Sequence, residues 1–155
     1  MPVFDPQDIA LMEAALEDAR AAQAEDEVPV GALVALEGQI IARAHNRPIA
    51  LCDPTAHAEM LALRAAGAAL KTYRLAGATM YVTLEPCTMC IGAMINARIA
   101  RLMFGARDPK AGAAGSVYDI GRDGRLNHRI EIYPGLQEIR CAEILSRFFS
   151  QRRGG

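Results

Sequence analysis

Two short segments carry side chains that could bind a metal ion and move a proton. A His-Ala-Glu segment begins at His57, and a Pro-Cys-Thr-Met-Cys segment begins at Pro86. Zinc binds Cys thiolates and His nitrogens, and with only three protein ligands it keeps a bound water whose pKa falls to about 7. The ligand types and their spacing therefore predict a hydrolytic zinc site, with the ligands His57, Cys87 and Cys90. Glu59, two residues after the first ligand, is the predicted proton carrier.

A Cys-x-x-Cys pair is more often half of a structural zinc site, or a redox pair. A structural site needs a fourth Cys or His. The available residues are Cys52, Cys141, His45 and His128. None of the four forms a second closely spaced ligand pair, and a structural site would leave the Glu59 carboxylate without a role. The ligand count and the adjacent carboxylate favour the catalytic interpretation.

Length and composition indicate one globular domain over residues 1–155. The chain is 52% hydrophobic and 23% charged, as is ordinary for a globular protein. No apolar run approaches the roughly 20 residues of a membrane-spanning helix, so we expect no membrane association. Segment 1–20 lacks the basic start of a signal peptide, and the four cysteines form no disulfide framework. We therefore expect a protein of the reducing cytoplasm.

The charge is unevenly distributed along the chain. The net charge is −1, but residues 1–30 hold eight acidic residues and one Arg. The remainder holds ten acidic and sixteen basic residues, which leaves it with a charge of about +6. A basic face suits contacts to RNA phosphates, although scattered surface arginines explain the same numbers. Charge alone does not decide between these two interpretations.

Hydrophobic periodicity and turn signals predict alternating helices and strands. The predicted helices cover 6–24, 56–68, 88–97 and 136–152. The predicted strands cover 30–36, 39–45, 78–84, 100–105 and 130–133, with a long loop over 108–127. The strand–helix–strand order over 78–105 requires a parallel strand pair, whereas Glu37-Gly38 indicates a hairpin. We therefore predict a three-layer α/β/α fold with a mixed sheet of about five strands.

These elements should bring the zinc ligands together. His57 and the Cys87/Cys90 pair each fall at the first turn of a predicted helix, where the partial positive charge favours thiolate over thiol. The i, i+3 spacing puts both sulfurs on one helix face. Ligand sites of open α/β sheets lie beyond the carboxyl ends of the strands, where we expect the two helix starts to meet.

Further segments extend the zinc motif into a more selective pattern. The selective parts are Asn46-Arg47-Pro48 and the stretch from Gly105 to Ser116. The other matching segments are Val28–Ala32, Asp53–Glu59, Tyr73–Leu75, Tyr81–Cys90 and Asn127–Arg129. Together they resemble the bacterial tRNA-specific adenosine deaminases, zinc enzymes of the cytidine and deoxycytidylate deaminase superfamily. The resemblance implies a cytidine deaminase-like fold and conversion of the wobble adenosine of an anticodon to inosine, with release of ammonia.

The resemblance also implies a role for each residue of the reaction centre. One zinc ion per subunit would be bound by His57, Cys87 and Cys90. Glu59 would take the proton of the attacking water, deliver one to N1 of adenine and help to protonate the departing ammonia, as hydroxide attacks C6. Asn46 would hold the flipped nucleoside, although Asn before Arg-Pro is also a common turn residue. No organic cofactor is implied.

The remaining implied contacts are to RNA. Asp108 would accept a hydrogen bond from a ribose 2′-OH, and Arg107 and Lys110 would contact phosphates. An ordinary turn at Asp108-Pro109 in a solvated loop accounts for the same residues. Of Phe148 and Phe149, one should be a core residue and the other exposed; the sequence does not decide which, and Phe149 is our candidate for stacking on an anticodon base. The implied partners are a tRNA anticodon stem-loop, typically an arginine tRNA with an ACG anticodon, and a second subunit in a homodimer.

Two other functions are compatible with parts of the pattern. A deaminase of free guanine, cytosine or a nucleoside would use the same zinc chemistry. A small-molecule pocket would not need the loop from Arg107 to Ser116 or the basic C-terminal helix. A non-catalytic RNA-binding zinc module is the second alternative, and the intact Glu59 argues against it.

Overall fold

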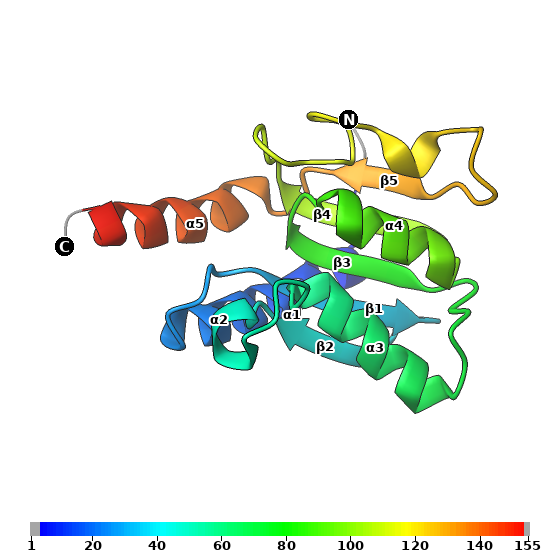
Figure 1. Cartoon of the computed structure of the whole chain (residues 1–155), viewed down its shortest axis with the longest axis horizontal. Helices are drawn as coiled ribbons and strands as arrows, with labels where there is room; N and C mark the ends of the chain where they lie inside the picture. Colours follow the sequence, from blue (N-terminus) through cyan, green and yellow to red (C-terminus); the bar gives the residue numbers. More distant parts are fainter. Residues whose placement is uncertain (1–3, 154–155) are drawn as a thin grey trace.

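The computed structural model describes residues 4–153, which form one five-stranded sheet with flanking helices (Figure 1). The strands are β1 (Gly31–Leu36), β2 (Gln39–His45), β3 (Thr79–Leu84), β4 (Arg101–Ala106) and β5 (Glu131–Pro134). Their order across the sheet is β2-β1-β3-β4-β5. β1 pairs antiparallel with both of its neighbours, whereas β3 with β4 and β4 with β5 are parallel. The predicted mixed sheet and its parallel βαβ pair are confirmed.

Helices cover both faces of this sheet. The four longer ones are α1 (Pro6–Ala24), α3 (Ala58–Leu70), α4 (Thr88–Ala97) and α5 (Glu138–Arg153). Because successive strand residues point to opposite faces, Val82 packs in the core beneath α3 and α4, and Tyr81 packs in the core beneath α1 and α5. The far end of α5 extends past the sheet (Figure 1). The three-layer α/β/α architecture is therefore confirmed.

Two short helices are absent from the sequence-based prediction. The helix α2 (Pro48–Leu51) lies between β2 and α3, and the 3-10 turn η1 (Ile120–Arg122) interrupts the predicted loop. A single turn is too short to display a 3.6-residue hydrophobic repeat, and no side chain of α2 is buried. Within residues 4–153, no helix is long and apolar enough to cross a bilayer.

The N-terminal helix is fixed to the sheet by polar and steric contacts. Asp5 accepts a hydrogen bond from the Asp8 N–H at 2.8 Å, and the Asp8 carboxylate accepts one from the Tyr81 hydroxyl at 2.7 Å. A Cβ at Gly31 would lie 1.9 Å from the carbonyl oxygen of Ala15, so β1 can approach α1 this closely only with glycine. These contacts fix α1 across the centre of the sheet, on the face opposite α3 and α4.

Candidate active site

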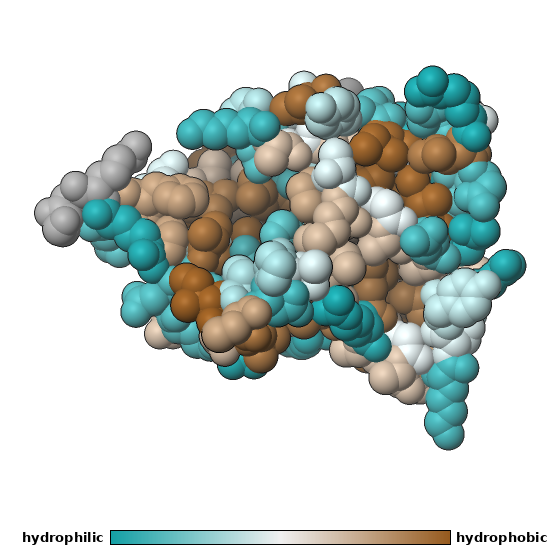
Figure 2. All heavy atoms as spheres, viewed as in Figure 1, coloured by the Kyte–Doolittle hydropathy of each residue, from teal (hydrophilic) through white to brown (hydrophobic). Residues whose placement is uncertain are grey.

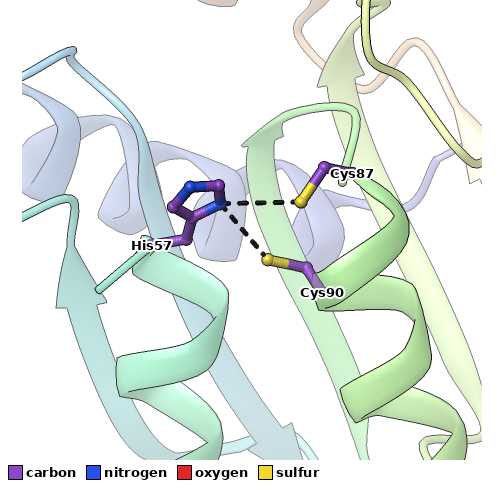
Figure 3. A group of neighbouring side chains, drawn as sticks. All are labelled: His57, Cys87 and Cys90. Carbon is purple, nitrogen blue, oxygen red and sulfur yellow. Dashed lines mark hydrogen bonds between the residues drawn. The ribbon is translucent and has the colours of Figure 1, made fainter. Parts of the chain in front are cut away.

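Three predicted metal ligands meet at the starts of two neighbouring helices (Figure 3). His57 is the N-cap residue of α3, Cys87 is the N-cap residue of α4, and Cys90 is the third residue of α4. β3 ends at Leu84 and leads directly to Cys87, so the site lies beyond the carboxyl end of a central strand. The structure therefore confirms the prediction that two helix starts meet at the site.

The distances between these ligand atoms fit one tetrahedral zinc ion. The Nδ1 atom of His57 lies 3.6 Å from the sulfur of Cys87 and 3.6 Å from that of Cys90. Tetrahedral zinc, with Zn–S of about 2.3 Å and Zn–N of about 2.05 Å, separates nitrogen and sulfur ligands by about 3.6 Å. Cys90 is buried while His57 and Cys87 are half-buried, so a fourth ligand can approach from the solvent side.

The side chains that could have closed a structural site lie elsewhere. Among residues 4–153, the three ligands form the only group of three or more His, Cys, Asp or Glu side chains close enough to share a metal. His45 contacts Glu25 at 2.6 Å, and His128 contacts the carbonyl oxygen of Ile99 at 2.7 Å. Cys52 is exposed, and Cys141 packs in the core beneath α1 and α5. The described chain therefore supplies three ligands and leaves the fourth position open.

The two thiols of the ligand set share a proton in the metal-free protein. Hydrogen bonds from Cys90 and from His57 lower the pKa of the Cys87 thiol to about 3. The same bond to Cys87, together with burial, raises the pKa of Cys90. Cys87 is therefore a thiolate before metal arrives, and zinc binding must displace the remaining proton from Cys90.

Glu59 lies in the first turn of α3, beside the ligands. Its side chain is 4% exposed, and burial raises its pKa from 4.5 to about 7. The contribution of burial outweighs the nearby positive charge of His57, which acts to lower the pKa. A carboxyl group with a pKa near 7 can both accept and donate a proton at neutral pH. The site therefore combines three metal ligands with a buried carboxyl group that titrates near neutral pH.

Comparison with known proteins identifies this arrangement. Residues 5–106 match the cytidine and deoxycytidylate deaminase zinc-binding region. The tRNA-specific adenosine deaminase of Agrobacterium fabrum is 50% identical to the chain, over 92% of this chain and 93% of that protein. The chain belongs to the tRNA-specific adenosine deaminase family. It therefore carries the zinc site of that family at His57, Cys87 and Cys90.

Solved structures agree with the family assignment. A structure from a study of A-to-I editing by tRNA:A34 deaminases at the wobble position of transfer RNA superposes with a TM-score of 0.85. It is 50% identical, and the match covers 88% of this chain and 99% of that one. A guanine deaminase from Nitrosomonas europaea superposes with a TM-score of 0.76 at 28% identity, over 97% of this chain and 87% of that one. The cytidine deaminase-like fold is therefore confirmed.

In this member of the tRNA-specific adenosine deaminase family, Asn46 lies beside the reaction centre. It follows β2, and its Oδ1 atom accepts a hydrogen bond from the Ala58 N–H at 2.8 Å. His57 makes no side-chain capping bond, so Asn46 caps α3 from twelve residues earlier in the chain. The side chain that the sequence proposes for substrate contact is thus held against the turn that carries Glu59.

Two acidic residues that the sequence analysis did not select hold the Asn46 segment. Glu27 is 1% exposed, and its carboxylate accepts hydrogen bonds from the N–H groups of Ile49 and Ala50 at 3.1 and 2.8 Å. Glu25 contacts His45 at 2.6 Å and accepts a hydrogen bond from Arg47 Nε at 3.2 Å. The only sign of this role in the sequence is a run of three acidic residues just before the Val-Pro-Val-Gly segment.

The predicted RNA contacts gather in a second place, at a cleft of about 710 Å³. Its lining includes Arg107, Asp108, Lys110 and Phe149, together with Val28, Leu84, Pro109, Leu145, Ser146 and Arg152. Figure 2 shows apolar surface on α5 and on α2, at the end of the molecule where this cleft opens. The zinc ligands, Glu59 and Asn46 are not among the lining residues found within 4–153. The end of β3 connects the two places, since Leu84 lines the cleft three residues before Cys87.

The cleft also distinguishes the two phenylalanines of α5. Phe148 is 6% exposed, and the Arg152 guanidinium lies 4.5 Å from its ring centroid. Phe149 is 45% exposed and lines the cleft. Asp108 is half-buried, and its Oδ1 atom accepts hydrogen bonds from the N–H groups of Lys110 and Ala111, so the turn suggested by the sequence is present. Phe148 is therefore the core residue of the pair, and Phe149 the exposed one.

Proposed function

We propose that the protein deaminates adenosine to inosine at the wobble position, A34, of tRNA. The observation that carries the proposal is the zinc ligand set with a buried glutamate beside it, in a chain that is half identical to a tRNA-specific adenosine deaminase over almost its whole length. His57, Cys87 and Cys90 would hold the zinc ion, which when bound supplies an activated water for attack on C6 of adenine.

In this proposal Glu59 moves the protons of the reaction. It accepts a proton from the attacking water, delivers one to N1 of adenine, and helps to protonate the departing ammonia. Its burial and its pKa of about 7 support this role, because the same group must be a base and then an acid at one pH. Asn46 orients the flipped base through its side-chain amide, and the hydrogen bond from Asn46 to the Ala58 N–H supports a fixed geometry for that contact.

We propose that the cleft beside α5 takes the RNA around the flipped nucleotide. Arg107 and Lys110 would contact phosphates, and the Asp108 carboxylate would accept a hydrogen bond from a ribose 2′-OH. Phe149 would stack on a base of the anticodon loop, for which its exposed ring in the cleft is suited. The mixture of basic groups with one aromatic face supports a single-stranded RNA segment as the occupant.

The resemblance further supports a homodimer, with the RNA groove crossing the subunit boundary. The continuous sheet through residues 4–153 supports one domain, 1–155, as the unit of each subunit. The four free cysteines support a reducing compartment, the cytoplasm. Sedimentation of the zinc-loaded protein tests the dimer, which should run at twice the chain mass of 16.7 kDa.

Inosine formation on an arginine tRNA transcript with an ACG anticodon tests the proposed function. The product is measured by nucleoside mass spectrometry after digestion, with free adenosine, guanine and cytidine as parallel substrates. We expect inosine from the tRNA and no turnover of the free compounds. Turnover of guanine, with the tRNA untouched, would instead support the function of the 28% identical guanine deaminase. Turnover of free adenosine or cytidine, with the tRNA untouched, would keep the zinc mechanism and overturn the tRNA as substrate.

A further inference from the structure

A further buried carboxylate, that of Glu85, lies in the chain between Leu84, which lines the proposed RNA cleft, and the zinc ligand Cys87. Glu85 follows β3 directly, precedes Pro86-Cys87, and is 2% exposed. Its Oε1 atom accepts hydrogen bonds from the Asp108 N–H at 3.0 Å and from the Ser116 hydroxyl. Its Oε2 atom accepts from the N–H groups of Ala114 and Ser116 at 3.0 and 3.1 Å. Four donors, all from the loop after β4, therefore surround one side chain.

The backbone of this loop packs closely against the Glu85 carboxylate at Gly112. A Cβ at Gly112 would lie 2.3 Å from Oε2 of Glu85 and 2.6 Å from the carbonyl oxygen of Asp108. The backbone is fixed at the same point, because the Glu85 N–H donates to Ala106 and the Ala113 N–H donates to Pro86, both at 2.8 Å. Residues 107–116 thus form a strap that is attached to the Glu85-Pro86 dipeptide through side chain and main chain.

Accepting all four bonds at once requires an ionised carboxylate, whose two oxygens accept hydrogen bonds and donate none. A glutamine has nearly the same shape, but its amide nitrogen is a donor and would face N–H groups of the loop. No side-chain nitrogen or oxygen buried within residues 4–152 lacks a hydrogen-bond partner, and the Glu85 cluster is part of that fully paired interior. The chemistry of this cluster is therefore specific to Glu at position 85.

We propose that Glu85 is a positioning residue for RNA binding. It holds the strap 107–116 so that Arg107, Asp108 and Lys110 line the same cleft as Phe149. The inference rests on the proposed function, since it assigns to Glu85 the geometry of the surface that would bind the tRNA. Glu85 also lies two residues before the zinc ligand Cys87, so a role in supporting the zinc site is the alternative to a role in RNA positioning. A role in RNA positioning appears in KM, and a role in the zinc site appears in kcat and zinc content.

The substitution Glu85→Gln tests the proposal in the zinc-loaded enzyme. We expect KM for the tRNA to rise about tenfold, because charge-assisted hydrogen bonds that hold the strap are lost. The kcat value should stay within about twofold of wild type, and zinc should remain stoichiometric. Hydrogen exchange at the amides of Asp108, Ala114 and Ser116 should accelerate by at least tenfold, with the amides of α4 unchanged.

Milder variants keep the test decisive if Glu85→Gln does not fold. Ser116→Ala removes one donor and leaves the three backbone bonds, so KM should rise about twofold to threefold. Gly112→Ala should reproduce the KM effect of Glu85→Gln through its Cβ clash. Gly92→Ala is the matched control, because a Cβ there meets no atom within 4 Å.

The outcomes separate this inference from the proposed function. Wild-type protein that forms no inosine on tRNA would overturn the proposed function. Unchanged exchange at the three strap amides in Glu85→Gln would overturn the positioning role, whatever the substrate. A fall in kcat with KM unchanged, or a loss of zinc, would assign Glu85 to the metal site and equally overturn the proposal.

Discussion

The Oδ1 atom of Asn46 accepts a hydrogen bond from the backbone N–H of Ala58 at 2.8 Å, and so caps the helix that begins between His57 and Glu59. A residue at the end of one strand thereby fixes the first turn of a helix that carries a metal ligand and the proposed proton carrier, Glu59. The sequence leaves substrate contact and an ordinary turn residue as alternatives for Asn46, and the structure adds helix capping. Capping is compatible with substrate contact, because the cap uses the Oδ1 acceptor and not the amide nitrogen of the same side chain.

Two substitutions at Asn46 should separate these roles. Asn46→Ala loses the cap and should lower the free energy of unfolding by about 1 kcal/mol. Asn46→Asp keeps the acceptor and places a negative charge at a helix N-terminus, so its stability should stay close to wild type. Both should lose most deaminase activity, because neither has the amide donor. Full activity in Asn46→Asp would mean that Asn46 acts only as a cap, as urea unfolding and inosine assays together would reveal.

Glu59→Gln should strongly reduce kcat while leaving the metal bound. The amide is nearly isosteric but cannot accept and return a proton, so kcat should fall by about 10²- to 10⁴-fold. None of the three zinc ligands is altered, so elemental analysis should still find one zinc ion per chain. Wild-type kcat in this variant would show that the proton carrier is a different group.

Stability of the metal-free protein should depend on pH through Glu59. The folded-state pKa of about 7, against 4.5 for an exposed carboxyl, means that the folded state binds the proton more tightly. The Glu59 contribution is therefore fully favourable below about pH 4.5 and is lost as the pH rises through 7, a difference of about 3 kcal/mol. Urea unfolding of chelated wild type and chelated Glu59→Gln at pH 5 and pH 8 measures it. Parallel pH dependence in the two proteins would contradict the raised pKa.

Zinc removal should expose one highly reactive thiol. In the zinc-loaded protein, iodoacetamide should modify Cys52, which is the exposed cysteine. After chelation, Cys87 should react rapidly at neutral pH, because its pKa of about 3 keeps it as thiolate. Cys141 should remain unmodified, since burial raises its pKa to about 12. Peptide mass spectrometry with and without chelator compares the sites, and equal labelling of Cys87 in both would argue against its role as a ligand.

Alanine substitutions of the two phenylalanines of α5 should affect different quantities, the free energy of unfolding for Phe148 and the RNA affinity for Phe149. Phe148→Ala removes a ring that is 6% exposed and should lower the free energy of unfolding by about 3 kcal/mol. Phe149→Ala removes an exposed ring and should leave stability within about 0.5 kcal/mol of wild type. It should weaken binding of the anticodon stem-loop by about 1–3 kcal/mol if the ring stacks on a base. Fluorescence anisotropy in a Glu59→Gln background gives the affinity, and unaltered affinity would remove Phe149 from the RNA surface.

Most elements of the fold follow from local sequence patterns. The helix predicted over 88–97 is found as Thr88–Ala97, and the hairpin signal at Glu37-Gly38 corresponds to two residues with positive φ, 52° and 78°. Helix α2 escaped prediction because four residues carry no period. The sequence also did not predict that Phe148 is the core residue. Adjacent residues of a helix point only 100° apart, and which face of α5 is buried depends on the elements that it packs against.

The sequence by itself determined the chemistry of this protein. That chemistry depends on local properties: the types of the ligands, the i, i+3 spacing of Cys87 and Cys90, and a carboxylate two residues after His57. Residues this close in the sequence stay close together in any fold of the chain. Only the tertiary structure decided what surrounds that chemistry. Burial raises the pKa of Glu59. The carboxylates of Glu27 and Glu85 hold helix α2 and the loop after β4, which lie more than twenty residues away along the chain. Such contacts follow from the order of strands in the sheet and from the exclusion of water, neither of which is written in the spacing of neighbouring residues.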